Sequence, residues 1–109
     1  MSVFNAWIFL LIAGFLEVFW AVGLKYTEGF SRLVPSILTV SALILSMFFL
    51  SKSTQVLPMS TAYGIWVGIG ALGVALYGAL FFEEPLTIAR AVFLTLLLVS
   101  ILGLKITAS

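Results

Sequence analysis

The chain has 109 residues, of which 63% are hydrophobic and 8% charged, and its formal net charge at pH 7 is +1. A composition this apolar excludes an ordinary soluble domain, in which roughly a quarter of the residues are charged. The sequence contains no Cys, His or Asp, which excludes zinc centres, disulfides, thiol chemistry and imidazole catalysis. We therefore expect a membrane protein that is not an enzyme and has no metal, cofactor or nucleic-acid partner.

Four apolar segments follow one another, at about residues 3–26, 33–51, 59–82 and 86–105. Each is close to the roughly 20 residues that cross a bilayer as an α-helix. The connections are short and contain turn or helix-start residues, namely Gly29, Pro58 and Pro85. The sequence predicts an all-α membrane protein with one four-helix transmembrane domain over residues 1–109. Consecutive helices are expected to run antiparallel, with both termini on the same side of the membrane.

The first segment carries a carboxylate, Glu17, inside its apolar run. An ionisable group at the centre of a spanning helix costs on the order of 3 kcal/mol, so it needs a cationic partner or a functional reason. No Lys or Arg lies within a helical turn or two of it along the chain. We predict that Glu17 binds a proton, a cationic solute, or each in turn. The other acids, Glu28, Glu83 and Glu84, fall in expected loops and are assigned no chemistry.

The residues around Glu17 on its own helical face are small or aromatic. Gly14 precedes it by one turn and Trp20 follows it by one turn. A glycine allows another helix or a ligand to approach closely, and the indole N–H of Trp20 is placed to donate to the carboxylate. The alternative for Trp20 is a residue of the aromatic belt at the membrane surface.

The second and third segments offer further candidates for a cation site. Ser46, near the centre of the second, bonds either Glu17 or its own backbone. Tyr63 and Trp66 are one turn apart on the third segment, and they either line the site or pack as belt residues. We predict that all three line the site around Glu17.

Small residues mark two more features. A stripe on the third segment predicts close helix packing, and its members are Gly64, Gly68, Ala71, Ala75 and Gly78. Because several glycines also weaken a helix against bending, we expect Gly68 and Gly70 to act as a conformational hinge. On the fourth segment, Ser100 and Gly103 form a smaller patch that we assign to dimer packing.

The cationic residues are evenly divided between the two expected sides of the membrane. Lys25, Arg32 and Arg90 lie on one side, while Lys52, Lys105 and the N-terminal amine lie on the other. Such a balance predicts insertion in both orientations, although one unrecognised dominant signal is the alternative. Alternating-access transporters usually hold two inverted halves, and four helices contain no visible second half. We therefore expect an antiparallel, dual-topology homodimer with a site between two Glu17 carboxylates.

With these residues identified, the chain resembles the small multidrug resistance family over essentially its full length. The matching segments follow the family order: Glu17-Val18-Phe19-Trp20, Leu24-Lys25, Gly29-Phe30, Leu57-Pro58, Thr61-Ala62-Tyr63, Trp66, Gly68-Ile69-Gly70 and Gly103-Leu104-Lys105. Trp20 and Ser46 resemble the guanidinium-exporter subtype rather than the quaternary-ammonium subtype. One departure is Gly64, where the family is expected to have Ala.

The resemblance implies a proton-coupled antiporter that exports guanidinium across the bacterial inner membrane. In the implied homodimer, Glu17 of both copies binds guanidinium or protons. Trp20 and Ser46 would hold the carboxylate, and Tyr63 and Trp66 would line the site. The open alternatives are an exporter of quaternary ammonium and other hydrophobic cations, a heterodimer with a sister chain, and a non-transporting membrane subunit or passive channel.

Overall fold

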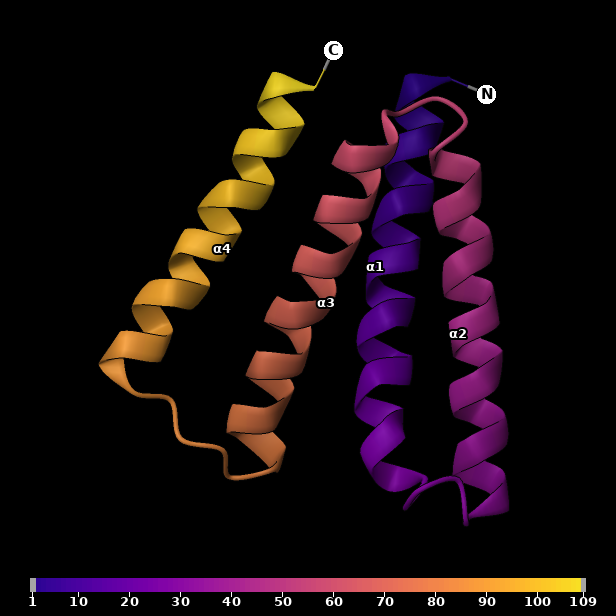
Figure 1. Ribbon diagram of the computed structural model, residues 1–109, viewed down its shortest axis with the longest axis vertical. Helices are drawn as coiled ribbons and strands as arrows, with labels where there is room; N and C mark the ends of the chain where they lie inside the picture. Colours follow the sequence, from indigo (N-terminus) through magenta and orange to yellow (C-terminus); the bar gives the residue numbers. More distant parts are fainter. Residues whose placement is uncertain (1, 109) are drawn as a thin grey trace.

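The computed structural model describes residues 2–108, which form four helices joined by short connections (Figure 1). The helices are α1 (Val3–Tyr26), α2 (Leu33–Ser53), α3 (Met59–Phe81) and α4 (Ile88–Thr107). All four are long and apolar enough to cross a membrane, which confirms the predicted all-α membrane fold. Consecutive helices run in opposite directions, and the two chain ends lie at the same end of the molecule (Figure 1).

The fourth helix begins later than the apolar run suggests. Its first residue is Ile88, because Thr87 caps the helix: the Thr87 side chain accepts a hydrogen bond from the backbone N–H of Arg90. A hydroxyl at this position satisfies one of the N–H groups that a helix start leaves without an acceptor. The residues before Thr87 therefore belong to the connection rather than to α4.

The helices are arranged around α1, which lies between α2 and α3 (Figure 1). Within residues 2–108, the backbone of α4 packs against that of α3 alone, and the ammonium group of Lys105 lies 5.6 Å from the centre of the Trp7 ring of α1. Ile101 is the one described residue of α4 that is buried. The fourth helix thus presents most of its apolar surface outward, to lipid or to another chain.

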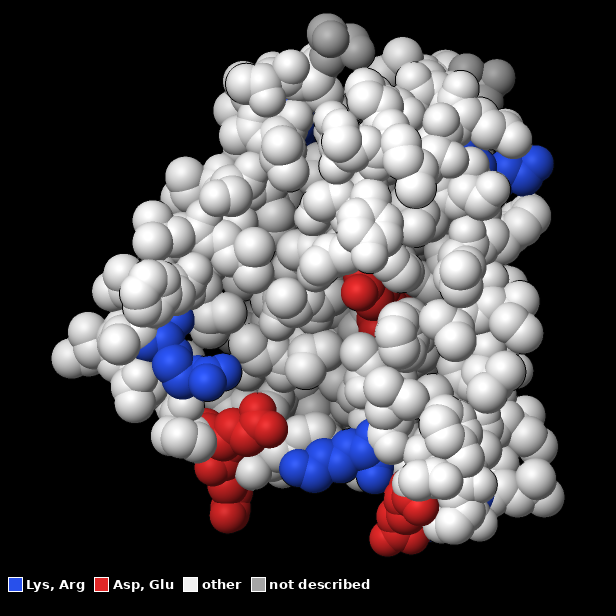
Figure 2. All heavy atoms as spheres, in the orientation of Figure 1, with Lys and Arg blue, Asp and Glu red and all other residues white. Residues whose placement is uncertain are grey.

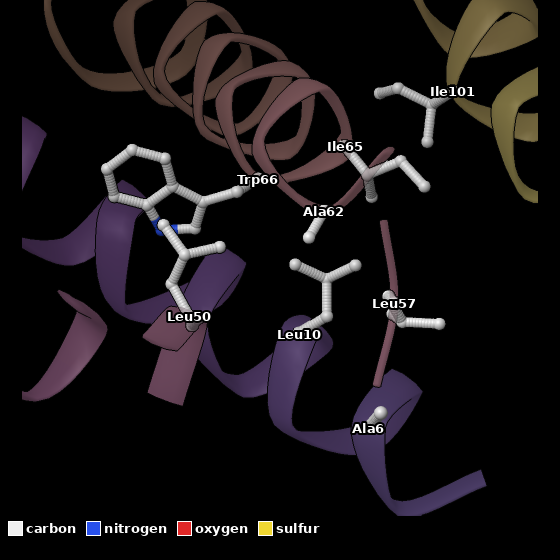
Figure 3. Close-up of a cluster of buried hydrophobic side chains, with 9 residues drawn as sticks. Ala6, Leu10, Leu50, Leu57, Ala62, Ile65, Trp66 and Ile101 are labelled. Carbon is white, nitrogen blue, oxygen red and sulfur yellow. The ribbon is translucent and has the colours of Figure 1, made fainter. Parts of the chain in front are cut away.

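The densest packing lies toward the end of the molecule that holds the chain termini. There a cluster of buried side chains joins all four helices and the connection between α2 and α3 (Figure 3). Its labelled members are Ala6, Leu10, Leu50, Leu57, Ala62, Ile65, Trp66 and Ile101. Since lipid is as apolar as these side chains, close van der Waals packing rather than exclusion of water holds such a cluster together.

Glycines on α3 bring this helix close to its neighbours. A Cβ on Gly68 would lie 2.6 Å from Ile101 Cδ1 of α4, and a Cβ on Gly64 would lie 3.2 Å from Leu104 Cδ1. Both distances are shorter than ordinary carbon contacts. Gly64 and Gly68 of the small-residue stripe therefore pack closely against α4, and the alanine expected at Gly64 would require only a small movement of Leu104.

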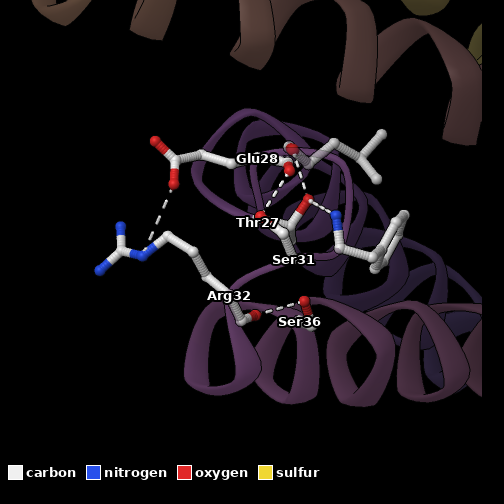
Figure 4. A network of polar contacts seen from close by, with 7 residues as sticks. Thr27, Glu28, Ser31, Arg32 and Ser36 are labelled. Atoms are coloured by element: carbon white, nitrogen blue, oxygen red, sulfur yellow. Dashed lines mark hydrogen bonds and ion pairs between the residues drawn. The ribbon is translucent and has the colours of Figure 1, made fainter.

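The connection between α1 and α2 is held by its own side chains (Figure 4). Thr27 is fully buried, and its hydroxyl accepts a hydrogen bond from the backbone N–H of Phe30 at 3.2 Å. Glu28, Gly29 and Phe30 have φ values of 49°, 74° and 65°, a left-handed run that reverses the chain tightly. This turn places Arg32 at the start of α2, where its Nε lies 4.0 Å from a Glu28 carboxylate oxygen.

Candidate functional site

Glu17 extends from the middle of α1 toward α3, where it meets Gly70. A Cβ on Gly70 would lie 2.6 Å from Glu17 Oε2 and 2.7 Å from Oε1. A side chain at this position would require the carboxylate to move from where it lies. Figure 2 shows acidic atoms in a hollow about halfway up the face, surrounded by uncharged side chains. The other charged groups on this face lie lower or toward its sides. Glu17 is the one acid that lies within a described helix, so this hollow is the candidate site.

Two buried polar atoms at this level lack hydrogen-bond partners among residues 2–108. They are Oε2 of Glu17, an acceptor, and Nε1 of Trp20, a donor. Unsatisfied polar groups are costly where no water is available, so a site that leaves them free is suited to a ligand or a second chain that supplies the partners.

The placement of Trp20 corrects one expectation. The two side chains share a face of α1, as predicted, but the indole N–H of Trp20 makes no hydrogen bond to Glu17 in the described chain. A spacing of three residues brings the side chains together without determining where the indole N–H points.

Ser46 also differs from the expectation that it holds the carboxylate. Its hydroxyl donates to the backbone carbonyl of Ala13 at 2.7 Å, and it accepts a hydrogen bond from Nε1 of Trp66 at 2.9 Å. Ser46 is fully buried, and a hydroxyl has one proton to give. Because that proton goes to Ala13, Ser46 links α1, α2 and α3 behind the site instead of bonding Glu17.

This link leads to a prediction about stability. We expect Ser46→Ala to lower the free energy of unfolding by about 1–2 kcal/mol, because the buried Trp66 N–H loses its acceptor. Trp66→Phe introduced into the Ser46→Ala chain should cost less than Trp66→Phe alone, since it removes the donor that has no acceptor. Unfolding of the wild type and the three variants in one detergent measures this coupling as a double-mutant cycle. Strictly additive effects would contradict the proposed link.

The other residues predicted to line the site are Tyr63, Trp66 and Gly14, and their surroundings differ. The ring of Tyr63 lies 5.7 Å from the ring of Trp66 at a tilt of 48°, so the two aromatic residues do pack together. Tyr63 is half-exposed and Trp66 is buried. Gly14 lies against α3, where a Cβ would come within 2.8 Å of Ile69 Cγ2. The structure therefore gives Gly14 a packing contact rather than an open position beside a ligand.

The hinge and dimer residues have distinct surroundings. α3 is a continuous helix through Gly68 and Gly70, so bending at these residues stays a prediction. Ser100 is exposed, and a Cβ on Gly103 would have nothing within 4 Å. Their role in dimer packing also stays a prediction, because a single chain does not test it.

Sequence reasoning missed an aromatic cluster at the other end of the helices. The hydroxyls of Tyr26 and Tyr77 lie 2.9 Å apart, and both rings contact the ring of Phe82. The ammonium group of Lys25 lies 4.3 Å from the centre of the Phe82 ring, within the range of a cation–π contact. These residues come from the ends of α1 and α3, about fifty residues apart in the sequence, which is why no local pattern indicates the cluster.

Comparison with known proteins gives consistent matches. The family model described as Small Multidrug Resistance protein matches residues 5–97. A protein named Guanidinium exporter from Salmonella typhimurium (strain LT2) is 55% identical over 103 residues, which cover 94% of this chain and 98% of the relative. The Guanidinium exporters of Proteus vulgaris and Citrobacter freundii are each 52% identical, over 94% of this chain and over 99% and 97% of their own lengths.

These matches extend from α1 into α4 and confirm the resemblance drawn from the motifs. The four helices make the chain a multi-pass membrane protein. The protein belongs to the small multidrug resistance family of membrane transporters.

Proposed function

We propose that the protein exports guanidinium across the bacterial inner membrane in exchange for protons. The observation that carries this proposal is the Glu17 carboxylate, which lies in the middle of a spanning helix with Oε2 unpartnered among the described residues. The relatives named Guanidinium exporter support the choice of substrate. Their bacterial sources support the choice of membrane.

The chemistry of guanidinium suits such a group. Guanidinium is planar, and two of its N–H groups can donate to both oxygens of one carboxylate. It is also less strongly hydrated than an ammonium ion, so moving it into a membrane site loses less hydration. The ring of Tyr63 is exposed, and Trp20 supplies a second aromatic ring. The faces of aromatic rings attract cations, and a planar cation can stack on them.

Antiport follows if protons and guanidinium occupy the same carboxylate in turn. A carboxylate that binds one cannot bind the other at the same oxygens, so the site changes its access from one side of the membrane to the other with either a proton or guanidinium bound. Inward movement of protons then drives outward movement of the substrate. Bending of α3 near Gly68 and Gly70 is the change we propose between the two access states.

A second copy of the chain completes the proposed transporter. An antiparallel homodimer would supply the inverted half that four helices lack and would place two Glu17 carboxylates in one site. The outward surface of α4, with Ser100 and Gly103 exposed, is available for that pairing.

Proton competition gives a direct test. We expect the affinity for guanidinium to fall as the pH is lowered, by at most about tenfold per pH unit for each proton displaced, because the protonated carboxyl does not bind the cation. Isothermal titration of purified protein with guanidinium, at pH values one unit apart, measures this slope. Proton release on guanidinium addition, recorded with a dye in weak buffer, checks the exchange independently.

The same titration separates the alternatives. Tetrapropylammonium, a bulky cation that has no N–H donors, should bind more weakly than guanidinium, and the reverse order would favour an exporter of quaternary ammonium ions. A guanidinium current that is independent of the proton gradient would indicate a passive channel. Affinity that does not change with pH, together with no proton release, would contradict the proposed exchange.

A further inference from the structure

A second concave feature lies along α1, and Glu17 is not among the residues that line it. It is a groove of about 490 Å³, within the roughly 300–1,000 Å³ typical of ligand sites. The floor is formed by α1 and one wall by α2, while α3 contributes Tyr77 on the other side. Its lining residues are almost all apolar or aromatic and include Phe15, Phe19, Val22, Leu38, Thr39 and Tyr77.

This groove opens on the side of α1 that faces away from the candidate site. Phe15 and Phe19 line it, and each is two residues from Glu17. Residues two apart on an α-helix point about 200° from each other. If two copies pair across their Glu17 faces, as the proposed function requires, the groove lies outside the shared site and faces the hydrocarbon of the membrane.

The length of the groove matches one leaflet of a bilayer. Along α1 it extends from Phe15 to Tyr26, which at 1.5 Å per residue is about 16 Å. Half of the hydrocarbon core of a bilayer is about 15 Å. The groove therefore runs from the end of the spanning helices to about the middle of the membrane, which is the reach of one lipid acyl chain.

The outer end of the groove carries a positive charge. Arg32 lines it there, at the start of α2. The guanidinium group of Arg32 has one ion pair among residues 2–108, a 4.0 Å contact from Nε to Glu28 in which both side chains are exposed (Figure 4). Such exposed pairs contribute little, so the terminal nitrogens are available to a phosphate, whose oxygens match the guanidinium fork.

We propose that this groove binds an anionic phospholipid, with one acyl chain between α2 and α3 and the phosphate at Arg32. The apolar lining suits an acyl chain, and the length of the groove matches a lipid of one leaflet. The positive charge of Arg32 favours an anionic headgroup. This inference rests on the proposed function in one respect, because pairing of two copies across their Glu17 faces is what leaves the groove facing lipid.

Native mass spectrometry of the purified, detergent-solubilised protein tests the proposal. Phosphatidylglycerol and phosphatidylcholine with identical chains are added in equal amounts, and lipids retained per chain are counted. We expect about a fivefold preference for phosphatidylglycerol, the ratio expected from one basic residue at an anionic headgroup. Arg32→Gln should remove the preference, whereas Arg90→Gln, an arginine outside the groove, should keep it.

A second pair of variants tests the acyl-chain position. Leu38→Trp fills the groove and should lower retention of both lipids, while Ile37→Trp, next to it on α2 and outside the lining, should not. Soluble glycerol phosphate, which has the headgroup phosphate without chains, should not displace bound lipid. Unchanged lipid retention in Leu38→Trp, or an unchanged preference in Arg32→Gln, would overturn the proposal.

Oligomeric state and guanidinium binding are measured on the same variants. If Leu38→Trp converts a dimer into single chains, the groove is an interface between copies and not a lipid site. Guanidinium binding should be unchanged in these variants, because the lipid site and Glu17 are separate. The wild-type protein could retain phosphatidylglycerol selectively and yet fail to bind guanidinium. That result would contradict the proposed function, whereas the lipid site would still be supported by the lipid measurements.

Discussion

Replacement of Glu17 by Gln is expected to abolish guanidinium transport and coupled proton movement together. Glutamine keeps nearly the same shape beside Gly70, but its amide is neutral and offers one acceptor oxygen and two donor hydrogens in place of two acceptor oxygens. A hydrogen bond to a charged group contributes about 1.5–3 kcal/mol, so losing the charge should weaken guanidinium binding roughly 10- to 100-fold. The amide also has no proton to exchange at ordinary pH, which removes the driving ion.

Reconstituted liposomes measure both movements in one experiment, with a pH-sensitive dye inside for protons and isotopically labelled guanidinium for the substrate. An imposed proton gradient should move guanidinium with wild-type protein and not with Glu17→Gln. Glu84→Gln is the matched control, because Glu84 lies in the connection before α4, outside the described helices. Guanidinium-coupled proton movement that persists in Glu17→Gln would refute the assignment of this carboxylate.

Gly70→Ala is expected to weaken guanidinium binding at least about tenfold without unfolding the protein. A Cβ at this position would come within 2.6 Å of Glu17 Oε2, so the carboxylate must turn or α1 and α3 must separate. Alanine is about 1 kcal/mol better than glycine inside a helix, so the substitution does not weaken α3 itself. Titration with guanidinium measures the affinity, and circular dichroism checks that the helices remain.

Two alanine variants separate this steric effect from bending of α3. Gly64→Ala is the mild control, because a Cβ there lies 3.2 Å from Leu104 Cδ1 of α4 and does not meet the carboxylate. Gly68→Ala places its Cβ against Ile101 of α4 instead of the carboxylate. If bending alone explains the glycines, Gly68→Ala and Gly70→Ala should slow transport equally and leave equilibrium binding unchanged, which would contradict the clearance role of Gly70.

The helices could be predicted from the sequence because four apolar runs of membrane-spanning length leave few other folds. Their ends depend on local chemistry that the apolar pattern does not contain, as the Thr87 cap at α4 shows. Glu17 could likewise be singled out, since a charge inside an apolar run stands out by its position alone. Family motifs around it then indicated the transporter family, which the matches to related proteins confirm.

The contacts within the site could not be predicted in the same way. Ser46 was a reasonable candidate for bonding Glu17 by depth in the membrane, but its hydroxyl meets the Ala13 carbonyl of another helix. The contact of Gly70 with Glu17 depends on the rotation of α3 against α1. Sequence spacing determines which residues share a face of one helix, whereas the partner across a helix interface depends on how two helices pack.

The peripheral position of α4, whose backbone packs against α3 alone, has a practical use. Because the chain has no native cysteine, a single cysteine at Ser100 would carry a spectroscopic probe at a unique position. That probe would lie on a helix whose backbone packs against α3 and which reaches α1 through Lys105 at Trp7, near the start of α1 and away from Glu17. Distances between such probes in a lipid nanodisc would therefore report how two copies are oriented while leaving the ion-binding carboxylate untouched.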